Sequence, residues 1–95
     1  MNYRNRKLLD TAKEMPCMNC GTQDGTTVPA HGNGLLFGRG IGMKSHDCYF
    51  AGLCFKCHYE YDFGQMNKDE KQDFFMRAML KTWMWLWRNE KIKVI

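Results

Sequence analysis

The most regular pattern of apolar and polar residues lies in the C-terminal third of the chain. From residue 68 onward, apolar side chains recur at intervals of three and four positions, which predicts an amphipathic helix. Asn67 precedes this pattern and Glu70 follows three residues later, a capping-box combination that marks the beginning of a helix. We expect the helix to run to about Asn89 and to bury one face, formed by Phe74, Phe75, Met79, Trp83, Leu86 and Trp87.

The N-terminal half predicts shorter elements. Residues 3–14 are basic and are expected to form a short helix that ends before Pro16. Residues 26–31 are β-prone, although Pro29 favours an edge or irregular strand. Residues 32–42 contain five glycines around a short apolar run, which predicts a hairpin or a mobile loop that approaches a ligand closely.

The segments that follow the glycine-rich loop complete the expected fold. Residues 48–53 form a second apolar, β-prone stretch that leads into Cys54. A helix is expected to begin there, to reach residue 62 or 63 and to stop near Gly64. In residues 91–95 polar and apolar side chains alternate, which predicts a short C-terminal strand. Together these elements predict a single α+β domain over residues 1–95.

Composition limits the function classes. The 95 residues carry a formal charge of +4, which is compatible with a phosphate-rich partner without identifying one. The longest strongly apolar run, residues 83–87, is too short to cross a bilayer, and the N-terminus has no apolar core of an export signal. We therefore expect a soluble cytoplasmic protein with reduced thiols and no membrane partner. Cys48, the unpaired member of five cysteines, is expected in the core.

The other four cysteines form two C-x-x-C pairs, Cys17 with Cys20 and Cys54 with Cys57. Four thiolates are the number that a tetrahedral structural zinc site needs, and the two-residue gap lets both sulfurs of a pair face one ion. The segment between the pairs, residues 21–53, is longer than the roughly 15–20 residues of a simple zinc ribbon. The sequence therefore predicts a Cys₄ zinc site with an inserted segment.

The second pair also satisfies a competing motif. Cys54, Cys57 and His58 match the C-x-x-C-H pattern of covalent c-type haem attachment. Haem would leave the first cysteine pair unexplained, and the sequence shows no export signal. Zinc is therefore the favoured interpretation.

The helix that follows Cys57 presents a second pair of possible ligands. His58 and Asp62 are four residues apart, so their side chains lie on the same face and could hold one divalent cation. Glu60 falls on another side of the helix and is expected to be solvated.

His31 comes from the inserted segment and is a candidate general base. An imidazole with a pKa near its ordinary value of about 6.5 can accept a proton from water near neutral pH. A cation beside it would hold a phosphate oxygen and stabilise the leaving oxygen of a phosphodiester. Three basic residues flank this region and are candidate phosphate contacts: Arg39, Lys44 and Lys56.

Taken in order, these segments resemble the HNH, or ββα-metal, endonucleases. The likeness comprises a cysteine pair, a strand that ends in a histidine, a glycine-rich loop and a Leu-Cys-x-x-Cys-His segment that begins a helix. It is closer still to small prophage-encoded nucleases of the YbcO type and covers most of the chain. The segments that carry it are Val28–His31, Gly40–Lys44, Asp47 and Leu53–Asp62.

The resemblance implies a small zinc-stabilised ββα-metal domain with a long C-terminal helix, and metal-dependent hydrolysis of DNA phosphodiester bonds. It implies that His31 is the general base and that His58 binds a catalytic cation, Mg²⁺ or Mn²⁺. The four cysteines would form the structural zinc site. DNA is then the expected partner, and a phage-encoded protein would act in the host cytoplasm.

The sequence departs from the HNH pattern in three ways. Ala30 stands where the family often has a metal-binding His or Asp, Asp47 stands in place of the middle Asn, and the glycine-rich loop is unusually long. The missing ligand is expected from Asp62, Asp47 or His46. Two alternatives to a nuclease remain open: a non-catalytic zinc module that binds DNA or a protein, and a degenerate nuclease retained as an interaction protein.

Overall fold

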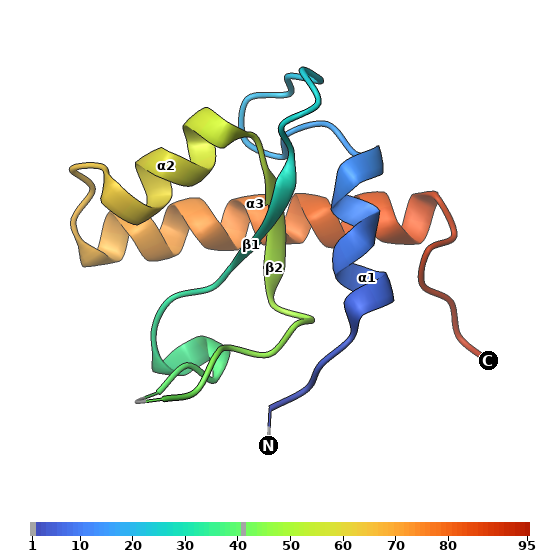
Figure 1. Cartoon of the computed structure of the whole chain (residues 1–95), viewed down its shortest axis with the longest axis horizontal. Coiled ribbons are helices and arrows are strands. Elements are labelled where there is room, and N and C mark those ends of the chain that lie inside the picture. The colour runs from blue at the N-terminus through green and yellow to red at the C-terminus, as the bar shows by residue number, and fades with distance from the viewer. Residues whose placement is uncertain (1, 41) are drawn as a thin grey trace.

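The computed structural model describes residues 2–40 and 42–95. Met1, and Ile41 of the glycine-rich segment, lie outside the described residues. Along the chain the elements are α1 (Arg6–Asp10), the 3₁₀ turn η1 (Thr11–Glu14), β1 (Val28–His31), the 3₁₀ turn η2 (Leu35–Phe37), β2 (Phe50–Leu53), α2 (Phe55–Phe63) and α3 (Lys68–Arg88). Figure 1 shows α3 running behind the two strands, with α1 and α2 on either side of them. The expected α+β class with a long C-terminal helix is confirmed.

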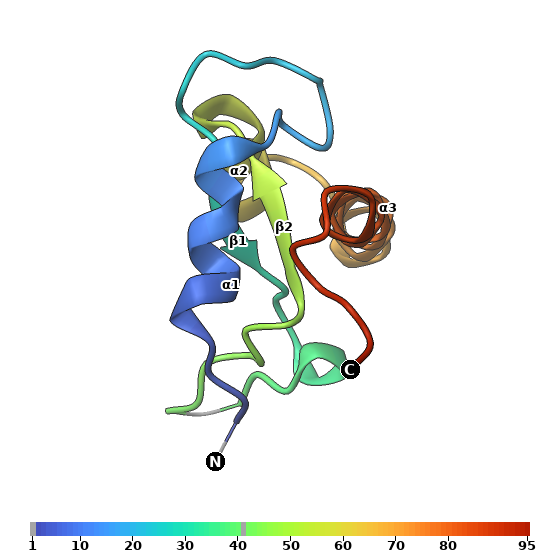
Figure 2. The same ribbon diagram turned by 90° about the vertical axis from the view of Figure 1, so that its right-hand side faces the viewer.

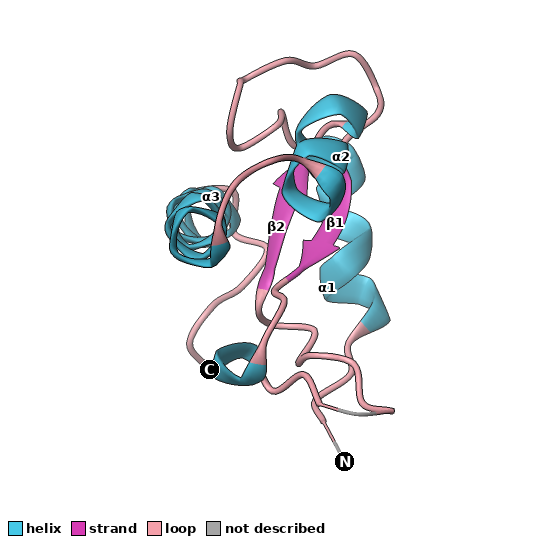
Figure 3. Ribbon diagram, turned by 90° about the vertical axis from the view of Figure 1, so that its left-hand side faces the viewer, coloured by secondary structure: helices cyan, strands magenta, loops and turns pink. Residues whose placement is uncertain are grey.

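The two strands form an antiparallel sheet that separates α1 from α2. Figures 2 and 3 view the molecule from opposite sides, and each shows one of these helices in front of the sheet and the other behind it. α3 packs along β2. The register pairs Val28 with Leu53, Pro29 with Gly52, Ala30 with Ala51 and His31 with Phe50.

The register also decides which face of the sheet each side chain occupies. Successive side chains of a strand point to opposite faces. Gly52 marks the face toward α1, because a Cβ atom there would overlap Sδ of Met15, which directly follows η1. His31 shares this face with Gly52, whereas Ala30 points to the opposite face, toward α2.

α3 begins as the sequence predicts. The side chain of Asn67 accepts a hydrogen bond from the backbone N–H of Glu70, and the Glu70 carboxylate accepts one from the N–H of Asn67. In the middle of the helix, Thr82 accepts a hydrogen bond from the N–H of Gly52 and donates one to the carbonyl of Ala78. The buried hydroxyl therefore joins α3 to β2, and it acts both as a hydrogen-bond donor and as an acceptor.

The predicted apolar face of α3 is confirmed in part. Phe75, Met79 and Leu86 are buried, and Phe74 and Trp83 pack against the core with part of their surface exposed. The prediction for Trp87 is wrong, because its side chain is 50% exposed. The helix extends beyond the two short strands (Figure 1), so its last turn has no sheet to cover.

The predicted C-terminal strand is also wrong. α3 ends in a Schellman motif, in which the N–H of Glu90 bonds to the carbonyl of Trp87 and the N–H of Lys91 bonds to that of Leu86. Glu90 takes the left-handed conformation that this ending needs, with φ of 56°. The turn directs the tail toward α1, where Lys91 pairs with Glu14 at 3.1 Å and residues 91–95 form no strand.

The N-terminal and glycine-rich segments differ from their predicted forms. The N-terminal helix begins at Arg6 rather than near residue 3, because Asn5 caps it by accepting a hydrogen bond from the N–H of Leu8. The glycine-rich segment contains η2 instead of a regular hairpin. Phe37 of η2 packs its ring edge-on against Phe75 of α3, with 4.9 Å between ring centroids. The loop is thereby attached to the core.

Within the described ranges, no helix combines the length and the apolar character that crossing a bilayer requires.

Gly32 provides a test of this packing, since a Cβ atom there would overlap the buried ring of Phe37. We expect Gly32→Ala to lower the free energy of unfolding by about 1–3 kcal/mol, because either the buried ring or the backbone must shift to relieve the overlap. Urea unfolding of the zinc-loaded protein measures this change. Gly40→Ala is the matched control, because a Cβ atom at Gly40 meets nothing within 4 Å. Equal stabilities of the two variants would contradict the packing.

Candidate metal centre and acid–base pairs

The four paired cysteines come together in one cluster. The sulfur atoms of Cys17, Cys20, Cys54 and Cys57 all lie within 4.8 Å of one another, and those of Cys20 and Cys54 are 3.7 Å apart. A tetrahedral zinc ion with Zn–S bonds of about 2.3 Å separates its sulfur ligands by about 3.8 Å. A disulfide would need about 2.05 Å. The cluster therefore has the donor set and the spacing of a structural zinc site, as the sequence predicts.

The first cysteine pair is shaped by a tight turn. The N–H of Gly21 bonds to the carbonyl of Cys17, and Gly21 adopts a φ of 80°, which a glycine reaches without strain. The N–H of Met18 bonds to the carbonyl of Gly52 at 2.8 Å. This bond attaches the first pair to β2 and so brings it beside the second pair.

The second cysteine pair lies where β2 gives way to α2. Cys54 is the N-cap residue of α2, and its side chain makes no capping hydrogen bond. Thr26 takes over part of this role from a distant loop, because its hydroxyl accepts a hydrogen bond from the N–H of Phe55 at 3.0 Å. The side chain of Asn19 donates to Sγ of Cys57 at 3.3 Å. A metal bound here would hold the start of α2 against the first cysteine pair.

Two of the four thiols differ strongly in pKa. Burial, with smaller contributions from the neighbouring thiols, raises the pKa of Cys57 to about 12 against the lowering effect of Asn19. Burial also acts to raise the pKa of Cys17, but hydrogen bonds from the backbone at Cys20, Cys54 and Asn19 outweigh it and lower the pKa to about 7. A divalent cation supplies the positive charge that allows all four sulfurs to bind as thiolates.

Two other cysteine predictions have an outcome. Cys48 does not belong to the sulfur cluster and is partly buried, and burial raises the pKa of its thiol. Its assignment as a non-ligand is therefore consistent with the structure. Cys54 and Cys57 lie in one cluster with Cys17 and Cys20. A metal site needs all four cysteines together, whereas covalent haem attachment needs only the second pair.

His31 forms an acid–base pair with Asp47. Its Nε2 atom lies 2.9 Å from Oδ1 of Asp47, whose side chain is only 6% exposed, while the His31 side chain is 27% exposed. Asp47 also accepts a hydrogen bond from Nη1 of Arg4 at 2.9 Å and one from the N–H of Asn5. Burial acts to raise the pKa of Asp47, but these three hydrogen bonds and the Arg4 charge lower it below its ordinary value. Asp47 is therefore an ionised, fixed acceptor.

Residues 2–5, which we call the N-terminal strap, hold this region in place. Arg4 donates to the carbonyls of Ser45 and Lys44, and Asn2 donates to those of Gly38 and Lys44. The strap is also bonded to residues 46 and 47: the N–H of Tyr3 donates to the side-chain Nδ1 of His46, and the N–H of Asp47 donates to the carbonyl of Tyr3. Sequence reasoning missed Arg4. The only available signal was that a buried aspartate needs a cationic partner.

His58 and Asp62 form the second acid–base pair. Nε2 of His58 lies 3.2 Å from Oδ2 of Asp62, and both side chains are about one-third exposed, at 33% and 34%. The predicted i, i+4 pairing of these side chains on α2 is therefore confirmed. Between residues 2–40 and 42–95, the four cysteines are the only group of three or more histidine, cysteine or carboxylate ligands, so no third such group joins this pair.

The two histidines do not meet in one cluster. His31 lies on the sheet face toward α1, where it is bonded to Asp47, while His58 belongs to α2 on the other side of the sheet. Ala30 occupies the strand position that faces α2, and its methyl group offers no ligand. Asp47 and His46 are bonded to the strap, and within residues 2–40 and 42–95 neither forms a group of three or more potential ligands with His58 and Asp62.

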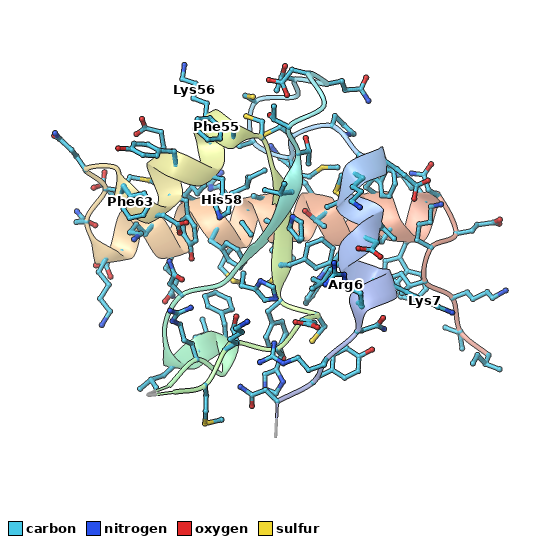
Figure 4. The ribbon with its side chains drawn as sticks, viewed as in Figure 1. Arg6, Lys7, Phe55, Lys56, His58 and Phe63 are labelled. Atoms are coloured by element: carbon cyan, nitrogen blue, oxygen red, sulfur yellow. The ribbon has the colours of Figure 1, made fainter. Side chains whose placement is uncertain are left out.

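The three predicted phosphate contacts are exposed but dispersed. Lys56 projects from the outer side of α2, away from His58 (Figure 4). Lys44 belongs to the segment bound by the strap. Arg39 follows η2, and its charge acts on the hydroxyl of Tyr61 in α2. Lys56 is thus the one of the three that belongs to the helix carrying His58, and Arg39 acts on that helix from the neighbouring loop.

Comparison with known proteins gave no match: no protein-family model, curated protein or solved structure matches this chain. The resemblance to HNH endonucleases therefore rests on the sequence motifs alone. The sulfur cluster and the two acid–base pairs carry the functional interpretation.

Metal content tests the sulfur cluster. We expect the purified protein to contain one zinc ion per chain and Cys57→Ser to lose most of it, because a hydroxyl is a far weaker zinc ligand than a thiolate. Cys48→Ser is the matched control and should keep its zinc, since Cys48 lies outside the cluster. Elemental analysis after dialysis measures both. Equal zinc loss from the two variants would argue against the assigned ligands.

The Asp47 network predicts a pH dependence of stability. The folded-state pKa of Asp47 is lowered, so its contribution is present above the unfolded pKa of about 3.9 and is lost as the pH falls through the lower folded value. We expect Asp47→Asn to cost about 2 kcal/mol of unfolding free energy at pH 7. The difference from wild type should shrink below about pH 4.

Urea unfolding of both proteins across this pH range measures the difference, in which effects common to both cancel. Asp73→Asn serves as the control, because Asp73 pairs with Arg77 on the exposed surface of α3. It should change stability by less than about 1 kcal/mol. A constant difference between Asp47→Asn and wild type down to the lowest pH would show that the charge of Asp47 is not responsible.

Proposed function

We propose that the protein is a metal-dependent endonuclease that hydrolyses DNA phosphodiester bonds. The observation that carries this proposal is the fixed His31–Asp47 pair at the end of β1. A buried carboxylate that holds one nitrogen of a partly exposed imidazole is an arrangement suited to general-base catalysis. The motif resemblance to HNH endonucleases points to the same residue.

The Asp47 carboxylate sets the proton arrangement of the His31 ring. Asp47 can only accept at Oδ1, so Nε2 of the neutral ring carries the hydrogen and Nδ1 keeps its lone pair. Nδ1 is then the atom that takes a proton from the attacking water. Once the ring is protonated, the adjacent carboxylate stabilises the imidazolium, and Arg4 keeps that carboxylate ionised.

His58 and Asp62 would hold the catalytic cation. One carboxylate with several waters is a common way to bind Mg²⁺, and Mn²⁺ also accepts an imidazole. When bound, the cation would supply charge stabilisation to the phosphate and to the leaving oxygen. Since no third histidine, cysteine or carboxylate among the described residues joins the pair, we expect weak binding of the cation, which a phosphate of the substrate would strengthen.

The sulfur cluster has a structural role in this proposal. Four protein sulfurs leave no open position on a tetrahedral zinc ion, so the ion would not activate water. Instead it would fix the beginning of α2 and thereby the position of His58 one residue beyond Cys57.

A non-catalytic zinc module that binds DNA or a protein is the second candidate. Two observations favour it: Ala30 provides no ligand on the face toward α2, and Arg4 already pairs with Asp47. A degenerate nuclease that is retained as an interaction protein would have the same features as the zinc module. Both would keep the sulfur cluster, and neither would need His31.

Replacing His31 with Ala distinguishes these functions. For the nuclease, we expect cleavage of supercoiled plasmid or branched DNA in Mg²⁺ or Mn²⁺ to fall by about 10²-fold or more, because a general base contributes roughly that factor. Zinc content and DNA affinity should stay unchanged. Arg77→Ala, an exposed change on α3, is the control and should cleave as wild type does.

Two results would count against the nuclease. Wild-type protein that binds DNA but cleaves none of these substrates in either cation would favour the zinc module. Undiminished cleavage by His31→Ala would remove His31 from the mechanism.

A further inference from the structure

A cleft of about 600 Å³ opens between the glycine-rich loop, α2 and the first turn of α3. Its walls include Leu35 and Leu36 from the loop, Tyr61 from α2, and Lys68 and Lys71 from α3. The volume lies in the range of sites that hold one small molecule or one unit of a polymer. None of the four residues of the acid–base pairs described above lines this cleft.

The loop side of the cleft is apolar and held in place. Leu35 and Leu36 are 85% and 62% exposed, although the neighbouring Phe37 is buried in the core. The N–H of Asn33 donates a hydrogen bond to the hydroxyl of the buried Tyr61 at 2.9 Å, which ties the loop to α2. The two leucines therefore form a supported apolar surface that the folded chain does not cover.

The α3 side of the cleft is cationic. Lys68 and Lys71 are three residues apart and so share one side of the helix, and Nζ of Lys71 lies 5.3 Å from the centre of the Tyr61 ring. The acidic residue nearest in sequence to Lys71, Glu70, is held in the helix cap by the N–H of Asn67. A ligand here meets positive charge on one wall and leucine side chains on the other.

The cleft lies between the two chain segments that carry the candidate catalytic groups. Asn33 follows His31 by two residues, and Tyr61 directly precedes Asp62. The cleft is therefore lined by residues close in sequence to each acid–base pair, Asn33 on the His31 side and Tyr61 on the Asp62 side. Neither Lys44 nor Lys56 lines the cleft.

We propose that this cleft binds an unpaired nucleotide of the DNA substrate, with a phosphate at Lys68 and Lys71 and the base against Leu35 and Leu36. In a duplex the base faces are stacked inside, so only the lysines would find a partner, whereas an unpaired base exposes an apolar face to the leucines. The proposal rests on the proposed nuclease function and adds the substrate class: DNA with a single-stranded or branched segment.

Binding without cleavage tests the cleft independently of catalysis. Fluorescence anisotropy follows a fluorescein-labelled thymidine oligonucleotide, and a hairpin duplex for comparison, with zinc-loaded full-length protein and no added Mg²⁺ or Mn²⁺. We expect wild type to bind the single strand more tightly than the duplex. The Lys68→Ala, Lys71→Ala double variant should lower the slope of log affinity against log salt by about 0.7, the value for one neutralised phosphate of a single strand.

Two further variants separate charge from apolar contact. The Leu35→Ser, Leu36→Ser variant should weaken single-strand binding several-fold and leave the salt slope unchanged, because it removes no charge. Lys81→Ala with Lys93→Ala removes two exposed lysines outside the cleft and is the matched control. Zinc content and circular dichroism confirm that each variant is folded.

Specific outcomes overturn the proposal. If the salt slope falls equally in the cleft lysine variant and in the control lysine variant, DNA is attracted by the overall positive charge and not by a site in the cleft. If the leucine variant binds the single strand as tightly as wild type does, the leucines do not contact a base. Equal affinity for duplex and single strand would also exclude an unpaired nucleotide. If wild type binds as expected yet cleaves no DNA, the nuclease function fails while the cleft stands.

Discussion

The convergence of four cysteine sulfurs is the constraint on which the rest of this structure depends. The two strands have only four residues each, and α1 is only five residues long, so regular structure alone provides little to hold the helices in place. The sulfur cluster joins the loop before β1 to the junction of β2 with α2, and thereby closes the chain around the sheet. Small domains commonly need such a metal link, because their cores bury too little apolar surface. A metal ion held by the four sulfurs would fix the first turn of α2 and therefore the direction in which His58 leaves it.

The two acid–base pairs occupy different environments, and this difference gives them different chemical capacities. Asp47 is buried and accepts three hydrogen bonds from two segments, the strap and β1, so it stays ionised and holds His31 in one orientation. Asp62 is partly exposed and pairs with His58 alone, so this pair remains open to a cation and its waters. A fixed base and an open cation site are the two components that hydrolysis of a phosphodiester requires. The two pairs lie on opposite sides of a narrow sheet, so in the proposed nuclease a substrate strand would pass the end of β1 to reach both.

Features that depend on residues near one another in sequence could be predicted from the sequence. The capping box of Asn67 and Glu70, the stop of α2 before Gly64 and the two cysteine pairs are all local, and each was found where expected. The pairing of His58 with Asp62 was predictable for the same reason. Arg4 and Asp47 are 43 positions apart, and no periodicity connects them. The exposure of Trp87 and the path of the tail depend on where the short strands end, and the pattern of α3 contains no such information.

Zinc K-edge X-ray absorption of the purified protein tests the central claim most directly, because it reports the atoms bound to the metal and their distances. The sulfur cluster predicts four sulfur neighbours at about 2.3 Å and no nitrogen or oxygen ligand in the first coordination shell. A shell that contains imidazole nitrogen or carboxylate oxygen would mean that the metal does not sit among the four cysteines. In that case the cluster would not be what fixes α2 and His58.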